Sequence, residues 1–147
     1  MKLNVINALR QIGEVYSAVL EMKIDNAAGF DTTGPLHVEL KYTYDGNKLS
    51  IFGNARIGIK GCCDRCLKDI TSGINFDFKE DFYKLEDAPD DEAYTFEKNF
   101  VDLEQPMLNL IELYAPMKFL CKEDCKGLCK ICGHDLNISD CAHVLKD

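Results

Sequence analysis

Cysteine spacing is the feature that most constrains how this chain of 147 residues can fold. Its eight cysteines fall into one cluster near the middle of the sequence and one near the C-terminus. Two cysteines three or four residues apart, with a tight turn between them, can both face one tetrahedral cation at about 2.3 Å. Three pairs have such spacing: Cys63 and Cys66, Cys121 and Cys125, and Cys129 and Cys132. This pattern predicts metal binding.

The start of the sequence indicates the compartment. Asn4, Asn7 and Arg10 interrupt its apolar residues, so we expect no secretory signal. No stretch approaches the roughly 18 apolar residues of a membrane span. We therefore expect a cytoplasmic protein without membrane contact. Thiols stay reduced in the cytoplasm, which favours bound Zn²⁺ over structural disulfides. A redox role for Cys63 and Cys66 is the alternative.

Two assignments give each zinc the four protein ligands of a closed structural site. In the first, the pairs 63/66 and 121/125 share one ion, and the second site lies wholly in the tail. In the other, the two C-x2-C pairs share one ion, as in a zinc ribbon, and Cys121 and Cys125 belong to a second site. The tail site of the first assignment consists of Cys129, Cys132, Cys141 and His143.

Three further residues near these sites have open roles. His143 is either a ligand or an exposed histidine, and His134 is a weaker ligand candidate. Cys62 lies next to a predicted ligand, so its side chain should point away from the metal. We expect it to be a buried or spare thiol.

Alternating apolar and polar residues predict strands over most of the first hundred residues. Residues 36–44 lead into the turn Asp45-Gly46-Asn47, and the return strand covers 48–60, where Gly53 suggests a bulge. Residues 70–82 place even-numbered apolar side chains on one face and a polar, solvated row on the other. An earlier strand, about residues 14–24, is indicated by Val15, Ser17, Val19 and Glu21.

A helix should follow these strands. Residues 86–92 form an acidic loop that we expect to be exposed and mobile, and a short strand is expected over 93–100. Asp102 is the predicted N-cap, with Gln105 completing a capping box. Pro116 should end the helix. Its apolar face consists of Met107, Leu110, Ile111 and Tyr114.

Together these elements predict an α+β fold. We expect a mainly antiparallel, curled β-sheet with one helix near the C-terminus and a zinc-knuckle tail. Residues 1–120 should form the β-rich domain with a C-x2-C hairpin and covering helix. Residues 121–147 should form a metal-binding tail packed on that domain. We expect a monomer.

Charge separates the cysteine regions from the rest of the protein. The formal charge of −8 argues against broad adhesion to nucleic acid or anionic lipid. The two cysteine regions nevertheless carry more basic than acidic residues. We therefore take Arg65, Lys122 and Lys126 as candidates for contact with nucleic acid or a partner. No phosphate-binding loop or catalytic motif is present, so we expect a protein that is not an enzyme.

Two phrases resemble a known family. They are Cys63-Asp64-Arg65-Cys66-Leu67, and residues 120–133, Leu-Cys-Lys-Glu-Asp-Cys-Lys-Gly-Leu-Cys-Lys-Ile-Cys-Gly, followed by Asp135-Leu136-Asn137. Both are similar to the YceD family of large-subunit ribosomal RNA accumulation proteins. The order of elements also matches. Two positions differ: Lys130 stands where proline is common, and Cys141-Ala142-His143 replaces what is often C-x-C.

The resemblance implies a non-enzymatic factor needed for normal levels of large-subunit ribosomal RNA, and hence for RNA processing or ribosome assembly. The implied partner is a ribosomal protein or an assembly intermediate of the large subunit, or the ribosomal RNA itself. An adaptor would fit these expectations, with zinc-fixed turns holding a small basic face. The acidic strand with Asp77, Glu80 and Asp81 would suit a basic protein.

Overall fold

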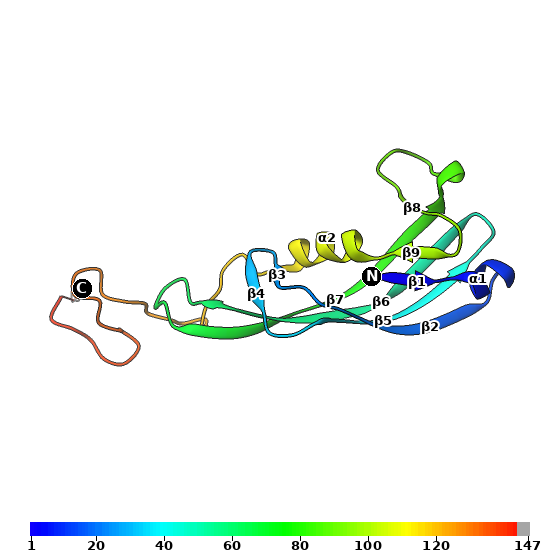
Figure 1. The fold of residues 1–147 in the computed structure, drawn as a ribbon. Coiled ribbons are helices and arrows are strands. Elements are labelled where there is room, and N and C mark those ends of the chain that lie inside the picture. The colour runs from blue at the N-terminus through cyan, green and yellow to red at the C-terminus, as the bar shows by residue number, and fades with distance from the viewer. Residues whose placement is uncertain (144–147) are drawn as a thin grey trace.

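The computed structural model describes residues 1–143. The predicted tail extends to residue 147, so residues 144–147 lie outside the described part. A curled, mostly antiparallel sheet forms the body of the protein, with a helix lying along it and the tail extending from one end (Figure 1). The strands are β1 (Lys2–Asn4), β2 (Val15–Met22), β3 (Asn26–Ala27), β4 (Phe30–Thr32), β5 (Leu36–Tyr44), β6 (Lys48–Cys62), β7 (Asp69–Lys84), β8 (Tyr94–Phe96) and β9 (Phe100–Asp102). The helices are α1 (Ile6–Arg10), the 3-10 turn η1 (Leu85–Asp87) and α2 (Glu104–Tyr114).

The central hairpin forms as the sequence predicts. Strand β5 spans the predicted residues and pairs with β6 from Tyr44↔Leu49 to His37↔Arg56. The Asp45 carboxylate accepts the backbone N–H groups of Asn47 and Lys48, both at 2.8 Å, which holds the turn. Gly46 supplies the positive φ of +95° that this turn requires.

Gly53 does not form the predicted bulge, because the register runs unbroken through its pair with Leu40. Its role is to let two backbones approach closely. A Cβ on Gly53 would lie 2.0 Å from the Glu39 carbonyl oxygen and 2.7 Å from the Leu40 Cα. Only glycine therefore fits at this position.

Strand β7 confirms the predicted division of faces. Ile74, Phe76, Phe78 and Phe82 are buried, whereas the odd-numbered residues from 71 to 79 are exposed. The buried row meets the inward side chains of β5 and β6, and α2 covers it. The core of α2 consists of Pro106, Met107 and Ile111. Tyr114, from the predicted apolar face, is half exposed and stacks on Phe76 at 5.1 Å.

Strand β2 exists where predicted, but the residues that indicated it lie on the solvent side. Val15, Ser17, Val19 and Glu21 are exposed, and the intervening residues turn inward. Both faces of this strand carry apolar residues, so alternation alone did not determine which one faces the core.

The chain before α2 also differs from the prediction. The strand expected over 93–100 divides into β8, which pairs in parallel with β7, and β9, which pairs with β1. Leu103, rather than the predicted Asp102, occupies the N-cap position of α2. Asp102 lies in β9 and accepts the backbone N–H of Glu104 at 3.0 Å. The capping box does not form, because the Gln105 side chain donates to Asn109. Pro116 follows the helix as expected. The short helix α1, which directly follows β1, was not predicted.

Candidate metal centre

The first C-x2-C pair lies in the turn that joins β6 to β7. The ladder between these strands extends to Cys62↔Asp69, and the Cys63 N–H then donates to the Lys68 carbonyl at 2.9 Å. The Leu67 N–H donates back to the Cys63 carbonyl at 2.9 Å. The prediction that this pair caps a hairpin is confirmed.

The segment after α2 docks on this turn through backbone and side-chain bonds. The Asp64 N–H donates to the Phe119 carbonyl at 2.7 Å, and the Phe119 N–H donates to the Asp64 carboxylate at 2.8 Å. The Phe119 ring is buried against Phe30 at 5.1 Å. Gly61 leaves room for that ring, because a Cβ there would lie 3.1 Å from it. These contacts bring the chain to the first cysteine pair just before Cys121.

Four thiols meet as a result. Cys63 Sγ lies 3.7 Å from Cys125 Sγ, and Cys66 Sγ lies 3.7 Å from Cys121 Sγ. All four sulfurs lie within 4.8 Å of one another. A disulfide would need about 2.05 Å, whereas sulfurs bonded at about 2.3 Å to one tetrahedral ion lie about 3.8 Å apart. The set Cys63, Cys66, Cys121 and Cys125, called the hairpin group below, could hold a metal ion.

A second set lies in the tail. Cys129, Cys132, Cys141 and His143 bring their donor atoms within 4.8 Å of one another, and this tail group could also hold a metal ion. Cys141 Sγ lies 4.0 Å from His143 Nδ1. The structure therefore groups the residues in the first of the two arrangements considered above. The ribbon arrangement would need Cys129 and Cys132 beside Cys63, and they lie in the other group.

The two C-x2-C turns share one backbone geometry. In the tail, the Cys129 N–H donates to the His134 carbonyl at 2.8 Å, and the Gly133 N–H donates to the Cys129 carbonyl at 2.9 Å. These bonds repeat those at the hairpin with the same spacing. Gly133 has a φ of +75°, and Leu67, at the matching position, has a φ of +60°. Leu67 therefore adopts a conformation that leucine disfavours.

Backbone N–H groups point at the sulfurs and favour thiolates. The pKa of Cys63 is lowered to about 6, chiefly by the backbone N–H of Cys66, which outweighs the opposing effect of burial. The N–H groups of Cys132 and Ile131 lower the pKa of Cys129 to about 6. Burial raises the pKa of Cys121 to about 12, and the neighbouring thiols of the group add to this effect. A thiolate that is favoured in the fold is the form that binds metal.

Asn137 ties the chain between Cys132 and Cys141 to the hairpin group. Its amide donates to Cys125 Sγ at 3.4 Å and to the Asp135 carboxylate at 2.8 Å, and its side-chain oxygen accepts the Lys126 N–H at 2.9 Å. The Leu136 N–H donates to the Gly127 carbonyl at 2.9 Å. The chain after the second turn thus folds back on the segment that supplies Cys125. Asn137 lies in the Asp135-Leu136-Asn137 phrase, but no sequence pattern indicates its contact with Cys125.

The remaining candidates occupy distinct places. Cys62 is exposed and donates to the Asp69 carboxylate at 3.4 Å, which raises the pKa of its thiol. It is spare rather than buried. His134 lies near Ser139, at 2.9 Å, outside both groups. Lys122 and Lys126 are exposed. Their role in contact with nucleic acid or a partner stays a prediction.

Arg65 has a structural contact that its predicted role did not include. Its guanidinium donates to the Cys125 carbonyl at 2.8 Å, and its own carbonyl accepts the Leu128 N–H at 3.3 Å. Gly127 lies against it, since a Cβ there would lie 3.1 Å from the Arg65 oxygen. Arg65 therefore holds the tail to the hairpin.

A curled antiparallel sheet that presents two groups of sulfur-rich donors at one end defines a class of small β-proteins with candidate metal-binding turns. A family model for the large ribosomal RNA subunit accumulation protein YceD matches residues 52–147, from the middle of β6 through the tail. The chain belongs to the YceD family.

Curated relatives add no described function. The chain is 28% identical over 103 residues to uncharacterized protein Rv2926c of Mycobacterium tuberculosis (strain H37Rv) and to uncharacterized protein Mb2951c of Mycobacterium bovis. The match covers 67% of this chain and 50% of each relative, so the chain spans about half the length of the curated relatives it matches. No solved structure matches. Within residues 1–143, no helix is long and apolar enough to cross a membrane.

Proposed function

We propose that the protein is a non-enzymatic zinc-binding factor of the cytoplasm that promotes accumulation or processing of large-subunit ribosomal RNA during ribosome assembly. Membership of the YceD family, which is described as an accumulation factor, supports the ribosomal role. The observation that carries the metal-binding role is the hairpin group, in which four cysteines from two distant segments come together with the spacing of a tetrahedral site.

Zinc fits the donor chemistry. Thiolates are soft ligands, and three or four of them with at most one imidazole are typical of closed structural zinc sites. When bound, the ion would supply a cross-link rather than catalysis, because four protein ligands leave no position for water. The chain's own residues already align the parts: Asp64 and Arg65 dock the segment after α2, and Asn137 orients the Cys125 sulfur.

The exposed lysines in the tail and just before it are the best candidates for contact with RNA phosphates. Lys118, Lys122, Lys126 and Lys130 are exposed, and no ion pair involves them within residues 1–143. Arg65 is less available for contact with RNA, because its guanidinium donates a hydrogen bond to the Cys125 carbonyl. With a net charge of −8, the protein is repelled by RNA elsewhere on its surface. We therefore infer that binding to a basic ribosomal protein dominates and that RNA contact is local.

The acidic surface for such a partner is better placed in the loop than in the strand. Asp81 is paired with Lys48 at 2.8 Å, and Glu80 is half-buried on the inner side of β7. Asp77 alone of the three predicted acids is exposed. In contrast, five acids are exposed around the loop after β7: Glu86, Asp87, Asp90, Asp91 and Glu92.

A thiol oxidoreductase that uses Cys63 and Cys66 is the alternative. The lowered pKa of Cys63 favours it, since reactive cysteines have a stable thiolate. Burial disfavours it, because Cys63 is 0% exposed and Cys66 only 7% exposed. A reactive thiol must be reached by its substrate.

The function can be tested in cells whose own copy of the gene is replaced by variants. We expect Cys125→Ser to lower mature large-subunit ribosomal RNA relative to small-subunit RNA, because Cys125 belongs to the hairpin group and contacts both Arg65 and Asn137. Cys62→Ser is the matched control and should leave the ratio unchanged. An unchanged RNA ratio in cells that lack the protein altogether would exclude this function.

Charge reversal separates RNA contact from protein contact. Lys122→Glu with Lys126→Glu should weaken association with ribosomal RNA and flatten its salt dependence, because each phosphate contact contributes about 0.7–0.9 to the log–log slope. Neutralising the five loop acids should abolish binding of the basic ribosomal protein. Binding to precursor particles that depends on the lysines alone would show that RNA is the main partner. Metal content serves as the control for folding.

A further inference from the structure

Strand β2 is an open edge of the sheet. All eight of its residues pair with β5, and the sheet order within residues 1–143 places no strand on its other side. Edge strands usually carry lysine, proline or a bulge that prevents pairing with another chain. Residues 15–22 contain none of these, and their single charge is Glu21. Half of the backbone N–H and C=O groups of β2 therefore point away from β5, towards a side with no neighbouring strand among the described residues.

The core is also open at this edge. Tyr16, Ala18, Leu20 and Met22 point inward but are half-buried. Their partners across the ladder are buried to exposures of 7% or less: Tyr42, Leu40, Val38 and Leu36. The inner row of β2 lacks a neighbour on one side, so apolar area stays in contact with water.

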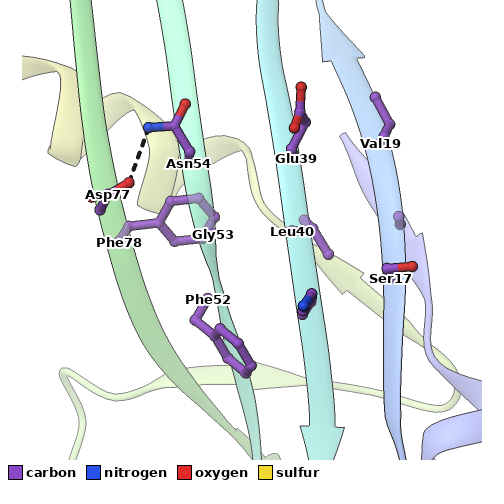
Figure 2. A pocket seen from close by; sticks show the side chains of 11 residues that line it. Ser17, Val19, Glu39, Leu40, Phe52, Gly53, Asn54, Asp77 and Phe78 are labelled. Atoms are coloured by element: carbon purple, nitrogen blue, oxygen red, sulfur yellow. Dashed lines mark hydrogen bonds between the residues drawn. The ribbon is translucent and has the colours of Figure 1, made fainter.

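The outer face of β2 carries exposed apolar side chains. Val19 is 64% exposed and Val15 is 56% exposed. Val19 and Ser17 border a hollow of about 800 Å³ that extends across the neighbouring strands to Phe52 and Asp77 (Figure 2). Figure 2 shows β2 as the outermost strand of this face.

We propose that a second copy of this chain pairs with β2 in antiparallel orientation about a twofold axis at Val19. The sequence of β2 is complementary to itself in this register, and no like charges lie opposite each other. The cross-chain neighbours are Val19 with Val19, Ala18 with Leu20, Ser17 with Glu21, and Tyr16 with Met22.

This register preserves the two faces of the sheet. Residues that pair across the axis have numbers of the same parity, so inward residues meet inward residues and outward ones meet outward ones. The two half-buried inner rows become neighbours, and the two sheets join into one. The hollows beside Val19 come to lie on the same face. The dimer replaces the monomer expected from the sequence and does not depend on the ribosomal function.

Introducing a charged residue at position 19 tests the dimer directly. The mass of the metal-loaded full chain is measured by sedimentation equilibrium. The wild type should have twice the mass of the chain, and Val19→Lys should weaken the dimer at least about tenfold, because two lysines would then face each other. The fold should tolerate this change, since Val19 is exposed and lies opposite Glu39 in the ladder. Ile12→Lys, at a residue that is 62% exposed outside β2, is the matched control and should remain dimeric.

Mixing tests the register. Val19→Lys chains and Val19→Glu chains should each dimerise weakly by themselves. The two variants should associate when mixed, because residue 19 faces residue 19 and the lysine would then lie opposite the glutamate. In a metal-loaded Cys62→Ser background, which removes the exposed spare thiol, oxidation should cross-link Val19→Cys chains but not Ser17→Cys chains. A monomeric wild type at concentrations on the order of 100 μM, a dimer indifferent to Val19→Lys, or cross-linking through residue 17 instead of residue 19 would each overturn the proposal.

Discussion

Single residues decide whether neighbouring parts of this protein can meet. Gly53 allows the β5 and β6 backbones to approach, Gly61 makes room for the Phe119 ring, and Gly127 lies against Arg65. The cysteines depend on such contacts, because the chain from Phe119 onward reaches the hairpin only if that ring fits. Small residues that are not themselves ligands thus help to position the sulfurs.

Gly53→Ala should reduce stability strongly. The added Cβ would lie 2.0 Å from the Glu39 carbonyl, so the two central strands would have to separate. We expect a loss of about 2–3 kcal/mol or more in the free energy of unfolding, measured with denaturant. Gly73→Ala is the control, because its Cβ would meet nothing closer than 3.9 Å. A Gly53→Ala protein as stable as the Gly73→Ala protein would contradict this view of the sheet.

At the scale of elements, the two C-x2-C turns form a natural pair for comparison. They have the same hydrogen bonds, but one has leucine where the other has glycine. The left-handed conformation costs a non-glycine residue about 1–2 kcal/mol, and glycine's freedom in the unfolded chain offsets about 0.4–1 kcal/mol of that. Leu67 thus adds strain to the hairpin turn.

Exchanging these residues should therefore change metal affinity in opposite directions. Leu67→Gly should tighten binding by the hairpin group about two- to fivefold, and Gly133→Leu should weaken binding by the tail group by a similar factor. No atom lies within 4 Å of a Cβ at Gly133, so its effect would be conformational rather than steric. Competition with a chelator measures both. Changes of the same sign would show that the turns are not equivalent.

Local patterns predicted the elements better than they predicted the pairing of elements. The β5–β6 hairpin and the face of β7 followed from alternation and from the Asp45 turn. The pairing of β1 with β9 joins residues about a hundred positions apart and involves three residues in each strand. Such a contact leaves no local pattern. Likewise, both cysteine arrangements satisfied the ligand count, and tertiary contacts such as the docking of Phe119 on Asp64 and of Arg65 on Cys125 distinguish them.

The whole molecule places its two charged regions far apart. The tail, with three exposed lysines in it and Lys118 just before it, extends from one end of the sheet. The acidic loop between β7 and β8 projects near the other end (Figure 1). The tail group lies within the tail, and the hairpin group lies where the tail joins the sheet. A bound ion in the hairpin group would fix the position of the lysines relative to the acidic loop. The fixed position of the lysines therefore depends on metal binding by these groups.

Metal stoichiometry tests this claim most directly. Purified protein should hold two zinc ions, and cobalt in their place should give the strong absorption of tetrahedral thiolate sites. Cys63→Ser and Cys121→Ser should each lose one and the same ion, whereas Cys129→Ser and Cys141→Ser should lose the other. Cys62→Ser should keep both. A folded, metal-free protein in which all eight thiols can be titrated would contradict the account.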